Sequence, residues 1–310
     1  MKKVIFIGGT SFSGSTVLDM TLANDPHGFS CGEVNAMFYP YRSHHIAPEC
    51  GCGKNSCNIW KETKSSGVRN LYTTIFKLFP NVEYIIDSSK DPYWIETHSR
   101  QLRTDGFDVK NVLIWKTPLE FAQSCNKRNR LPGWEQTWTD YHRLYFSLIP
   151  NFHLISYRDF TNEEFALKNL CRQLQISYFD SKKMFWQKEH HTLFGNTSAK
   201  IHLYNKDSET FKNAKKELVN TVSNSTNTIP KKYKNIYYDD VNDKTLINHV
   251  KQGIDTNPYI NTILKILHED VITHEFELNS RISQLKYNRN YLTVKRFYRA
   301  LKCFMKKFIL

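Results

Sequence analysis

Residues 4–16 read Val-Ile-Phe-Ile-Gly-Gly-Thr-Ser-Phe-Ser-Gly-Ser-Thr, and this stretch constrains the fold more than any other part of the chain. Its four leading residues are β-branched or aromatic, which predicts a strand buried on both faces in a sheet covered by helices. Gly8 and Gly9 end the strand, and from Thr16 the apolar residues recur at helical spacing. A strand, a glycine-containing loop and a helix in this order aim backbone N–H groups and the positive end of the helix dipole into one small space. The stretch therefore predicts an anion-binding site.

The loop has the glycine spacing of a Walker A motif but lacks its lysine. In that motif Gly14 would be followed by Lys, which reaches the β- and γ-phosphates of a triphosphate, and then by Ser or Thr. Here Ser15 and Thr16 follow it. A single 5′-phosphate could be held instead by loop amides and by the hydroxyls of Ser13, Ser15 and Thr16. Taken alone, the loop is also compatible with a tight turn after an ordinary α/β strand.

Later buried strands also run into polar loops that open a helix. Residues 82–86 lead into Asp-Ser-Ser-Lys at 87–90, and residues 109–115 lead into Lys116. A fourth strand is expected at 152–157. We expect helices at 17–24, 61–79, 93–103, 134–148 and 162–174. Since open α/β sheets bind ligands at the carboxyl ends of their strands, the pattern predicts a three-layer α/β/α fold with a mainly parallel central sheet and its site at that edge.

The chain has 310 residues, which suits one α/β domain with an appendage. We place the domain at 1–205 and a mainly helical carboxyl-terminal extension at 206–310. The formal charge of +13 suits a nucleotide, another acidic ligand or an anionic membrane surface. On charge alone nucleic acid is also compatible, but the loops at the strand ends favour a nucleotide, and no nucleic-acid partner is expected.

The tail from Tyr291 alternates apolar and basic residues at helical spacing. Such a helix could lie on an anionic membrane surface or dock on its own domain. The chain contains no run of eighteen apolar residues, and the amino-terminal apolar stretch is shorter than that of a secretory signal. We therefore expect a cytoplasmic protein, in contact with the inner membrane face if the tail binds lipid.

Residues 41–60 form an irregular insertion with cysteines at C-x-C-x4-C spacing: Cys50, Cys52 and Cys57. With His44 or His45 as a fourth ligand they could form a zinc site. Their spacing is not that of a standard zinc ribbon, so a local disulfide or a loop of free thiols is an equal alternative.

In these motifs and their order, the chain resembles the sulfotransferases that use 3′-phosphoadenosine 5′-phosphosulfate (PAPS). Four motifs in the family's order carry the resemblance, which covers about residues 4–200: the loop at 13–16, Asp-Ser-Ser-Lys at 87–90, the strand, turn and helix from Val112 to Ser124, and His-Thr-Leu-Phe-Gly-Asn at 191–196. Ser-Gly-Ser-Thr, the Gly-Glu at 32–33 and the Cys-x-Cys-Gly insertion are most similar to the bacterial-type branch. The resemblance implies a P-loop fold like that of the nucleotide kinases.

The resemblance also implies roles for individual residues. Ser13, Gly14, Ser15 and Thr16 would hold the 5′-phosphosulfate, with Ser88 beside them. Lys116 stands where the family has an arginine for the 3′-phosphate, and Ser124 matches its serine partner. Gly195, Asn196, Lys200 and His191 match a late loop that closes over the nucleotide. Glu33 matches the catalytic base, and His191 is its weaker rival.

The sequence departs from the family pattern at several positions. Phe12 replaces the basic residue that normally precedes Ser13, so we assign the cation that stabilises the leaving group to Lys90. Thr117-Pro118-Leu119 replaces the usual Asp-Pro-Arg, and Lys200 comes four residues after Asn196 where an arginine is expected at three.

The sequence thus predicts transfer of a sulfuryl group from PAPS to an acceptor hydroxyl, at the family level on a saccharide or glycolipid, with no metal required. Two alternatives are a nucleotide-dependent kinase with an atypical P-loop and a non-catalytic protein that binds polyanions or nucleotides.

Overall fold

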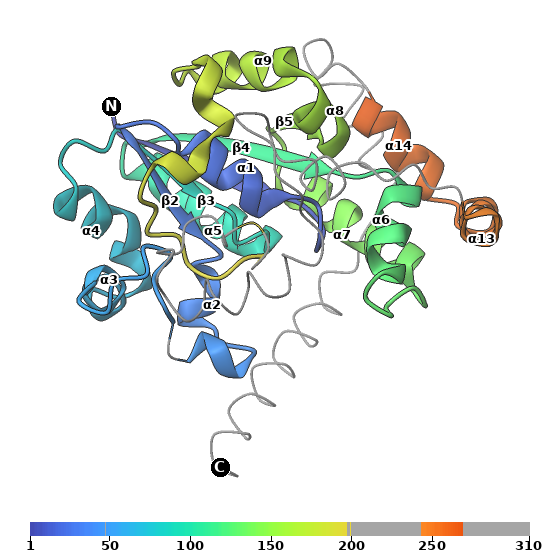
Figure 1. Cartoon of the computed structure of the whole chain (residues 1–310), viewed down its shortest axis with the longest axis horizontal. Coiled ribbons are helices and arrows are strands. Elements are labelled where there is room, and N and C mark those ends of the chain that lie inside the picture. The colour runs from blue at the N-terminus through green and yellow to red at the C-terminus, as the bar shows by residue number, and fades with distance from the viewer. Residues whose placement is uncertain (47, 197–198, 200–242, 269–310) are drawn as a thin grey trace, which may run out of the picture.

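The computed structural model describes residues 1–46, 48–196, 199 and 243–268. Its centre is a five-stranded sheet in the order β2-β3-β1-β4-β5, parallel throughout (Figure 1). The strands are β1 Lys3–Gly8, β2 Gly28–Gly32, β3 Tyr84–Asp87, β4 Asp108–Trp115 and β5 His153–Ser156. Because β3 and β4 flank β1 on opposite sides, the chain changes direction across the sheet at β1, and ligand sites in such sheets lie at this switch point.

Helices and short 3₁₀ segments connect the strands. The helices are α1 Ser15–Leu22, α2 Asn35–Phe38, α3 Ile59–Ser65, α4 Leu71–Leu78, α5 Pro92–Thr104, α6 Pro118–Asn126, α7 Trp134–Leu148, α8 Tyr157–Asn162, α9 Glu164–Leu174, α13 Lys244–Thr256 and α14 Ile260–His268. The 3₁₀ segments are η1 Ser43–His45, η2 Val68–Asn70, η3 Asp180–Lys183 and η4 Phe185–Gln187.

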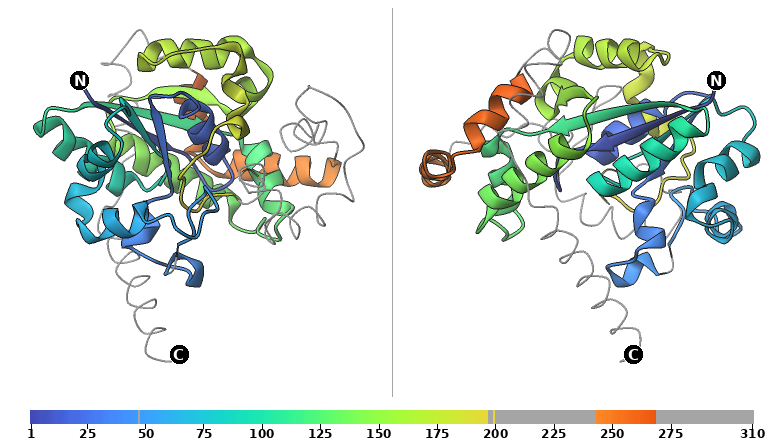
Figure 2. Two further views of the ribbon diagram at one scale, coloured as in Figure 1. Left: turned by 60° about the vertical axis from the view of Figure 1, so that its left-hand side comes forward. Right: turned by 180° about the vertical axis from the view of Figure 1, so that it is seen from behind.

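The alternating side chains of β1 show the three layers. Ile5 and Ile7 face a core formed with α1, α8 and α9. Val4 and Phe6 face the larger core, to which α4, α5 and α7 contribute. Seen from behind, α5 and α7 lie across this second face of the sheet (Figure 2). The predicted α/β/α fold with a parallel sheet is therefore confirmed.

The described part of the carboxyl-terminal extension packs on the domain. α13 and α14 contact α6 and α7, and Gly253 lies so close to Trp134 that a Cβ there would approach its ring to 2.8 Å. Both described segments of this extension are helical, as expected for it. Residues 206–242 and the basic tail from Tyr291 lie outside the described residues.

Two details of the predicted elements are wrong. The helix expected at 61–79 is broken between α3 and α4, where Gly67 has a φ of 83° that a helix cannot contain. The helix expected at 162–174 begins earlier and divides into α8 and α9. Among the described helices, none has both the length and the apolar character needed to cross a bilayer.

Candidate functional site

The first loop joins β1 to α1 through Gly14, which precedes the helix with a φ of 94°. A Cβ at this position would lie 2.3 Å from the ring of Tyr157, so only glycine fits both the conformation and the space. The N–H groups of the first helical turn find no partner within an α-helix and point out of its end. The hydroxyl of Ser13 is buried and, within the described residues, has no hydrogen-bond partner.

Lys116 and Ser124 meet where β4 ends and α6 begins. The Lys116 ammonium donates a hydrogen bond to Ser124 Oγ at 3.2 Å, and both residues are less than a tenth exposed. Pro118 starts α6, and Thr117 caps it in a capping box with Glu120. This short connection explains how residues eight positions apart converge.

Tyr157 joins these two parts of the site. The Lys116 ammonium lies 4.2 Å from the centre of the Tyr157 ring, and Gly14 is in contact with the same ring. The first loop and the Lys116–Ser124 pair therefore both lie against one aromatic side chain, at the same edge of the sheet. Burial lowers the pKa of Lys116 to about 8, because the surrounding protein solvates the ammonium poorly.

Arg128 places a second cation beside Phe12, the first-loop residue that replaces the family's basic residue. The guanidinium of Arg128, which follows α6, lies 4.2 Å from the centre of the Phe12 ring. It also donates a hydrogen bond to the carbonyl of Ser124 at 2.8 Å. A positive charge is thus present beside residue 12, although it comes from another segment.

Glu33 and Lys90 form an ion pair. The ammonium of Lys90 donates a short hydrogen bond to Glu33 Oε1, and the two side chains are 16% and 20% exposed. Glu33 follows β2 and Lys90 follows β3, and these strands are neighbours in the sheet. The two residues predicted to act on the acceptor and on the leaving group are therefore in direct contact.

The hydroxyl of Tyr141 links Lys90 to the first loop. It accepts a hydrogen bond from the Gly9 amide at 2.6 Å and donates one to the Lys90 carbonyl at 2.8 Å. Lys90 has a φ of 63°, a conformation that costs a non-glycine residue energy and that this hydrogen bond helps to hold.

The late loop reaches both the first helix and Glu33. Asn196 donates its amide hydrogen to Thr16 Oγ1 at 3.1 Å, and Gly195 is in contact with Thr16, where a Cβ would lie 2.8 Å from Oγ1. Leu193 accepts a hydrogen bond from the Glu33 amide at 2.9 Å, which fixes the backbone of Glu33. Lys200, predicted in the same loop, lies outside the described residues.

Ser88 binds a buried carboxylate of α1. Its hydroxyl is fully buried and donates to Asp19 Oδ2 at 2.6 Å, while the Gly32 amide donates to the same oxygen. Burial raises the pKa of Asp19 to about 7. In this arrangement the Ser88 hydroxyl joins the end of β3 to α1, and its role at the nucleotide stays a prediction.

His191 lies among the three cysteines of the insertion. Its Nδ1 is 3.4 Å from Cys50 Sγ and 3.7 Å from Cys57 Sγ, and its Nε2 is 3.7 Å from Glu189 Oε1. Both ring nitrogens thus face partners other than Glu33 or the first loop. His44 and His45, the residues expected beside the cysteines, instead lie near Phe194.

The sequence reasoning did not assign a site role to Tyr141, Tyr157 or Arg128. Tyr141 lies within the helix expected at 134–148 and belongs to no motif. Tyr157 ends the strand expected at 152–157, and this place at the carboxyl edge of the sheet is a usable signal. Arg128 lies in the basic run at 127–130 and belongs to no motif either.

No protein-family model matches this chain, and no curated protein matches it. Eight chains of solved structures are similar to it, and two of these have 14% sequence identity to it. A sulfotransferase domain from the curacin biosynthetic pathway has a TM-score of 0.47 and covers 83% of this chain and 99% of its own. A sulfotransferase domain from the Synechococcus PCC 7002 olefin synthase has a TM-score of 0.46, and the match covers 93% of this chain and 95% of that domain. Both are sulfotransferase domains, the kind of protein whose motifs the sequence resembles.

Proposed function

We propose that this protein is a sulfotransferase that moves a sulfuryl group from PAPS to an acceptor hydroxyl. The observation that carries the proposal is the convergence of Gly14 and Lys116 on the ring of Tyr157. One adenosine carrying a phosphate at each end of its ribose could contact both places. The loop would take the 5′-phosphosulfate, and Lys116 with Ser124 would take the 3′-phosphate.

The charges suit this ligand. Lys116 and Arg128 bring two cations to the segment that ends β4 and forms α6, and Lys90 brings a third to the end of β3. The charged form of a buried lysine such as Lys116 is stabilised when a phosphate replaces the water that it lacks. A basic residue is then not needed at position 12, since Arg128 supplies positive charge beside Phe12.

The proposed reaction uses the Glu33–Lys90 pair. The acceptor oxygen attacks the sulfur in line, the bond between sulfur and the bridging phosphate oxygen breaks, and the acceptor proton passes to Glu33. The electron pair of the broken bond stays on the leaving phosphate, where Lys90 stabilises the growing negative charge. Lys90 can orient the Glu33 carboxylate before the donor arrives and turn to the leaving oxygen as charge develops there.

His191 is not needed as a base in this scheme, because its ring nitrogens face Cys50, Cys57 and Glu189. The steps above use side chains and backbone amides only. The late loop, which contacts Thr16 through Asn196, would cover the donor and exclude water from the transfer.

Saccharide or glycolipid hydroxyls are the acceptors that we propose, by analogy with the family. We also propose a cytoplasmic protein that meets an anionic membrane through its basic tail, although that tail lies outside the described residues. The acceptor class is inferred from the resemblance, and the membrane contact is inferred from the basic and apolar pattern of the tail.

The direct test incubates the protein with PAPS carrying labelled sulfate and with extracts of saccharides and glycolipids. Transfer of label that stops in Glu33→Gln and in Lys90→Ala supports the proposal. Label transfer that is unchanged in both variants contradicts the assigned roles. Thermal-shift titration separates the alternatives: a kinase is stabilised by ATP with Mg²⁺, a polyanion-binding protein by heparin alone, and a sulfotransferase by 3′,5′-diphosphoadenosine.

A further inference from the structure

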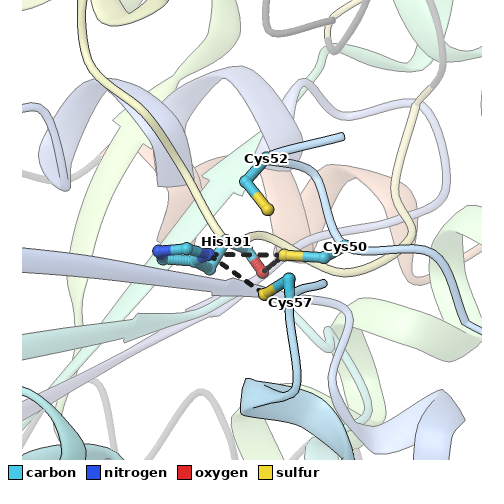
Figure 3. Close-up of side chains that lie close together, drawn as sticks. All are labelled: Cys50, Cys52, Cys57 and His191. Carbon is cyan, nitrogen blue, oxygen red and sulfur yellow. Dashed lines mark hydrogen bonds between the residues drawn. The ribbon is translucent and has the colours of Figure 1, made fainter. Parts of the chain in front are cut away.

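Four side chains outside the proposed reaction centre converge on one point. The ligand atoms of Cys50, Cys52, Cys57 and His191 all lie within 4.8 Å of one another. Figure 3 shows the thiols of Cys50 and Cys57 beside the imidazole, with the sulfur of Cys52 pointing toward them. The cysteines come from the insertion and the histidine comes from the late loop, about 140 residues further along the chain.

We propose that this cluster binds one zinc ion as a structural Cys₃His site. In tetrahedral zinc sites the Zn–S distance is about 2.3 Å and the Zn–N distance about 2.0–2.1 Å, which places a sulfur and a nitrogen of the same site about 3.5 Å apart. The Nδ1 of His191 is 3.4 Å from Cys50 Sγ and 3.7 Å from Cys57 Sγ. The distances from Nδ1 to these two sulfurs are thus already those of a filled tetrahedral site, and the fourth ligand atom, Cys52 Sγ, lies within 4.8 Å of the others.

Hydrogen bonds without a metal are the other way to satisfy this cluster. Cys50 Sγ lies 3.6 Å from the carbonyl oxygen of His191 and can donate to it, while Cys57 Sγ lies 3.7 Å from Nδ1. Thiols are weak donors, so these bonds stabilise the cluster little. The cysteines are free thiols, and no disulfide joins them. A metal ion would let all four atoms share one partner, with the thiols losing their protons as it binds.

The surroundings of His191 suit a metal ligand. Its other nitrogen, Nε2, lies 3.7 Å from a carboxylate oxygen of Glu189. Ligating histidines usually direct the second nitrogen to a carboxylate, which fixes the ring. Glu189 in turn forms an ion pair with Lys54, in which Nζ lies 2.5 Å from Oε2. Lys54 lies between Cys52 and Cys57 in the sequence, so it brings positive charge close to the thiols.

The backbone around the cluster already joins the two segments. The Gly51 amide donates to the carbonyl of Thr192 at 2.9 Å, and a Cβ at Gly51 would lie 2.8 Å from that oxygen. The indole of Trp60 donates to the carbonyl of His191 at 2.7 Å. Glycine between the first two cysteines therefore permits an approach that a larger residue would prevent.

The proposed zinc has a consequence for Glu33. Two residues after His191, Leu193 accepts the amide hydrogen of Glu33 and donates its own amide hydrogen to Cys31. A metal that ties residues 50–57 to His191 would therefore hold the loop against the end of β2. The zinc would be structural and take no part in transfer, so this inference stands whether or not the protein uses PAPS.

The test measures metal in the purified full-length protein. We expect one zinc per chain by elemental analysis, and after its removal by a chelator under reducing conditions we expect the visible absorption of tetrahedral, thiolate-bound Co²⁺ when cobalt is added. Cys52→Ser and His191→Ala should lose the metal and lower the unfolding temperature by several degrees. His44→Ala is the control, because it changes an exposed histidine that the sequence offers as a ligand but that lies outside the cluster. This variant should keep the zinc and the wild-type unfolding temperature.

Three results would overturn the proposal. The first is a well-folded wild-type protein that contains no zinc and gives no tetrahedral Co²⁺ spectrum. The second is equal zinc content in the wild type, Cys52→Ser and His191→Ala. The third is mass-spectrometric identification of a disulfide between two of the three cysteines in protein purified under reducing conditions. None of these measurements depends on sulfuryl transfer.

Discussion

Lys90 donates a hydrogen bond to Glu33 across the ends of two neighbouring strands, 57 positions apart in the chain. A carboxylate and an ammonium in contact at the edge of a sheet are most often a structural ion pair. Here the Glu33 amide is held by the late loop and the Lys90 carbonyl by Tyr141, which also binds the first loop. The pair is thus tied to the segments that we assign to the nucleotide.

Replacing Glu33 by glutamine should lower kcat about 10²- to 10⁴-fold, because the amide cannot take the acceptor proton. The affinity for 3′,5′-diphosphoadenosine should stay within about twofold, since Glu33 is assigned to the acceptor and not to the nucleotide. Steady-state transfer assays and calorimetric titration measure the two quantities. Full turnover in Glu33→Gln would show that another group is the base.

Tyr141→Phe should reduce both stability and turnover. It removes the acceptor of the buried Gly9 amide and the donor to the Lys90 carbonyl, and one buried group left unpaired costs about 1–3 kcal/mol. Urea unfolding measures the first effect, and transfer assays measure the second. Tyr145→Phe is a neighbouring control on the same helix, because its hydroxyl has only a long hydrogen bond of 3.4 Å to Val112. Equal effects of the two changes on turnover would contradict the role given to Tyr141.

Arg128→Met should weaken binding of 3′,5′-diphosphoadenosine about tenfold or more, because it removes a charge-assisted contact while keeping an apolar side chain on Phe12. The loss should shrink as salt is added, since screening already weakens the contribution of a half-exposed charge. Arg130→Met, two residues further on, is the matched control for net charge. If both variants bind equally well at low salt, Arg128 has no role in the nucleotide site.

The lowered pKa of Lys116 predicts a pH dependence of nucleotide binding. In the free protein Lys116 loses its proton as the pH rises through about 8. The ligand needs the charged form, and its phosphates are fully ionised above pH 7. Affinity should therefore be highest near pH 7 and fall progressively above pH 8, with net proton uptake on binding.

Lys116→Arg provides the control for that pH dependence. Arginine stays charged over the whole range and is the residue that the family usually has at this position. The variant should bind with an affinity that hardly changes between pH 7 and 9. Calorimetry in buffers of different ionisation enthalpy counts the protons, and the same pH profile in wild type and variant would mean that another group titrates.

The fold could be predicted from the sequence because its signals are local. The continuous apolar run of β1 and the glycines after it indicate a parallel strand and a loop, and the strand ends then place polar residues at one edge. The break at Gly67 has only a weak sequence signal, because residues 61–66 contain no apolar side chain that would mark a helical face, and a single glycine does not by itself end a helix. The positive φ of Gly67 shows where the helix stops.

The site was predictable in its parts but not in its contacts. The Lys116–Ser124 pair lies within one strand–helix unit, so its spacing carried the information. The contacts of Tyr157 with Gly14 and Lys116, of Arg128 with Phe12, and of His191 with the cysteines join distant segments. Nothing in the spacing of those residues indicates that the fold brings them together.

The claim on which the account depends is that the first loop and the Lys116–Ser124 pair hold the two phosphates of one adenosine. Calorimetric titration with 3′,5′-diphosphoadenosine and with adenosine 5′-monophosphate, on wild type and on Lys116→Met, tests it directly. We predict that the wild type binds the bisphosphate about 10- to 100-fold more tightly than the monophosphate, as expected for hydrogen bonds to a charged group. In Lys116→Met that preference should disappear while binding of the monophosphate persists. A wild type that binds neither ligand, or a variant that keeps the full preference for the bisphosphate, would contradict the account.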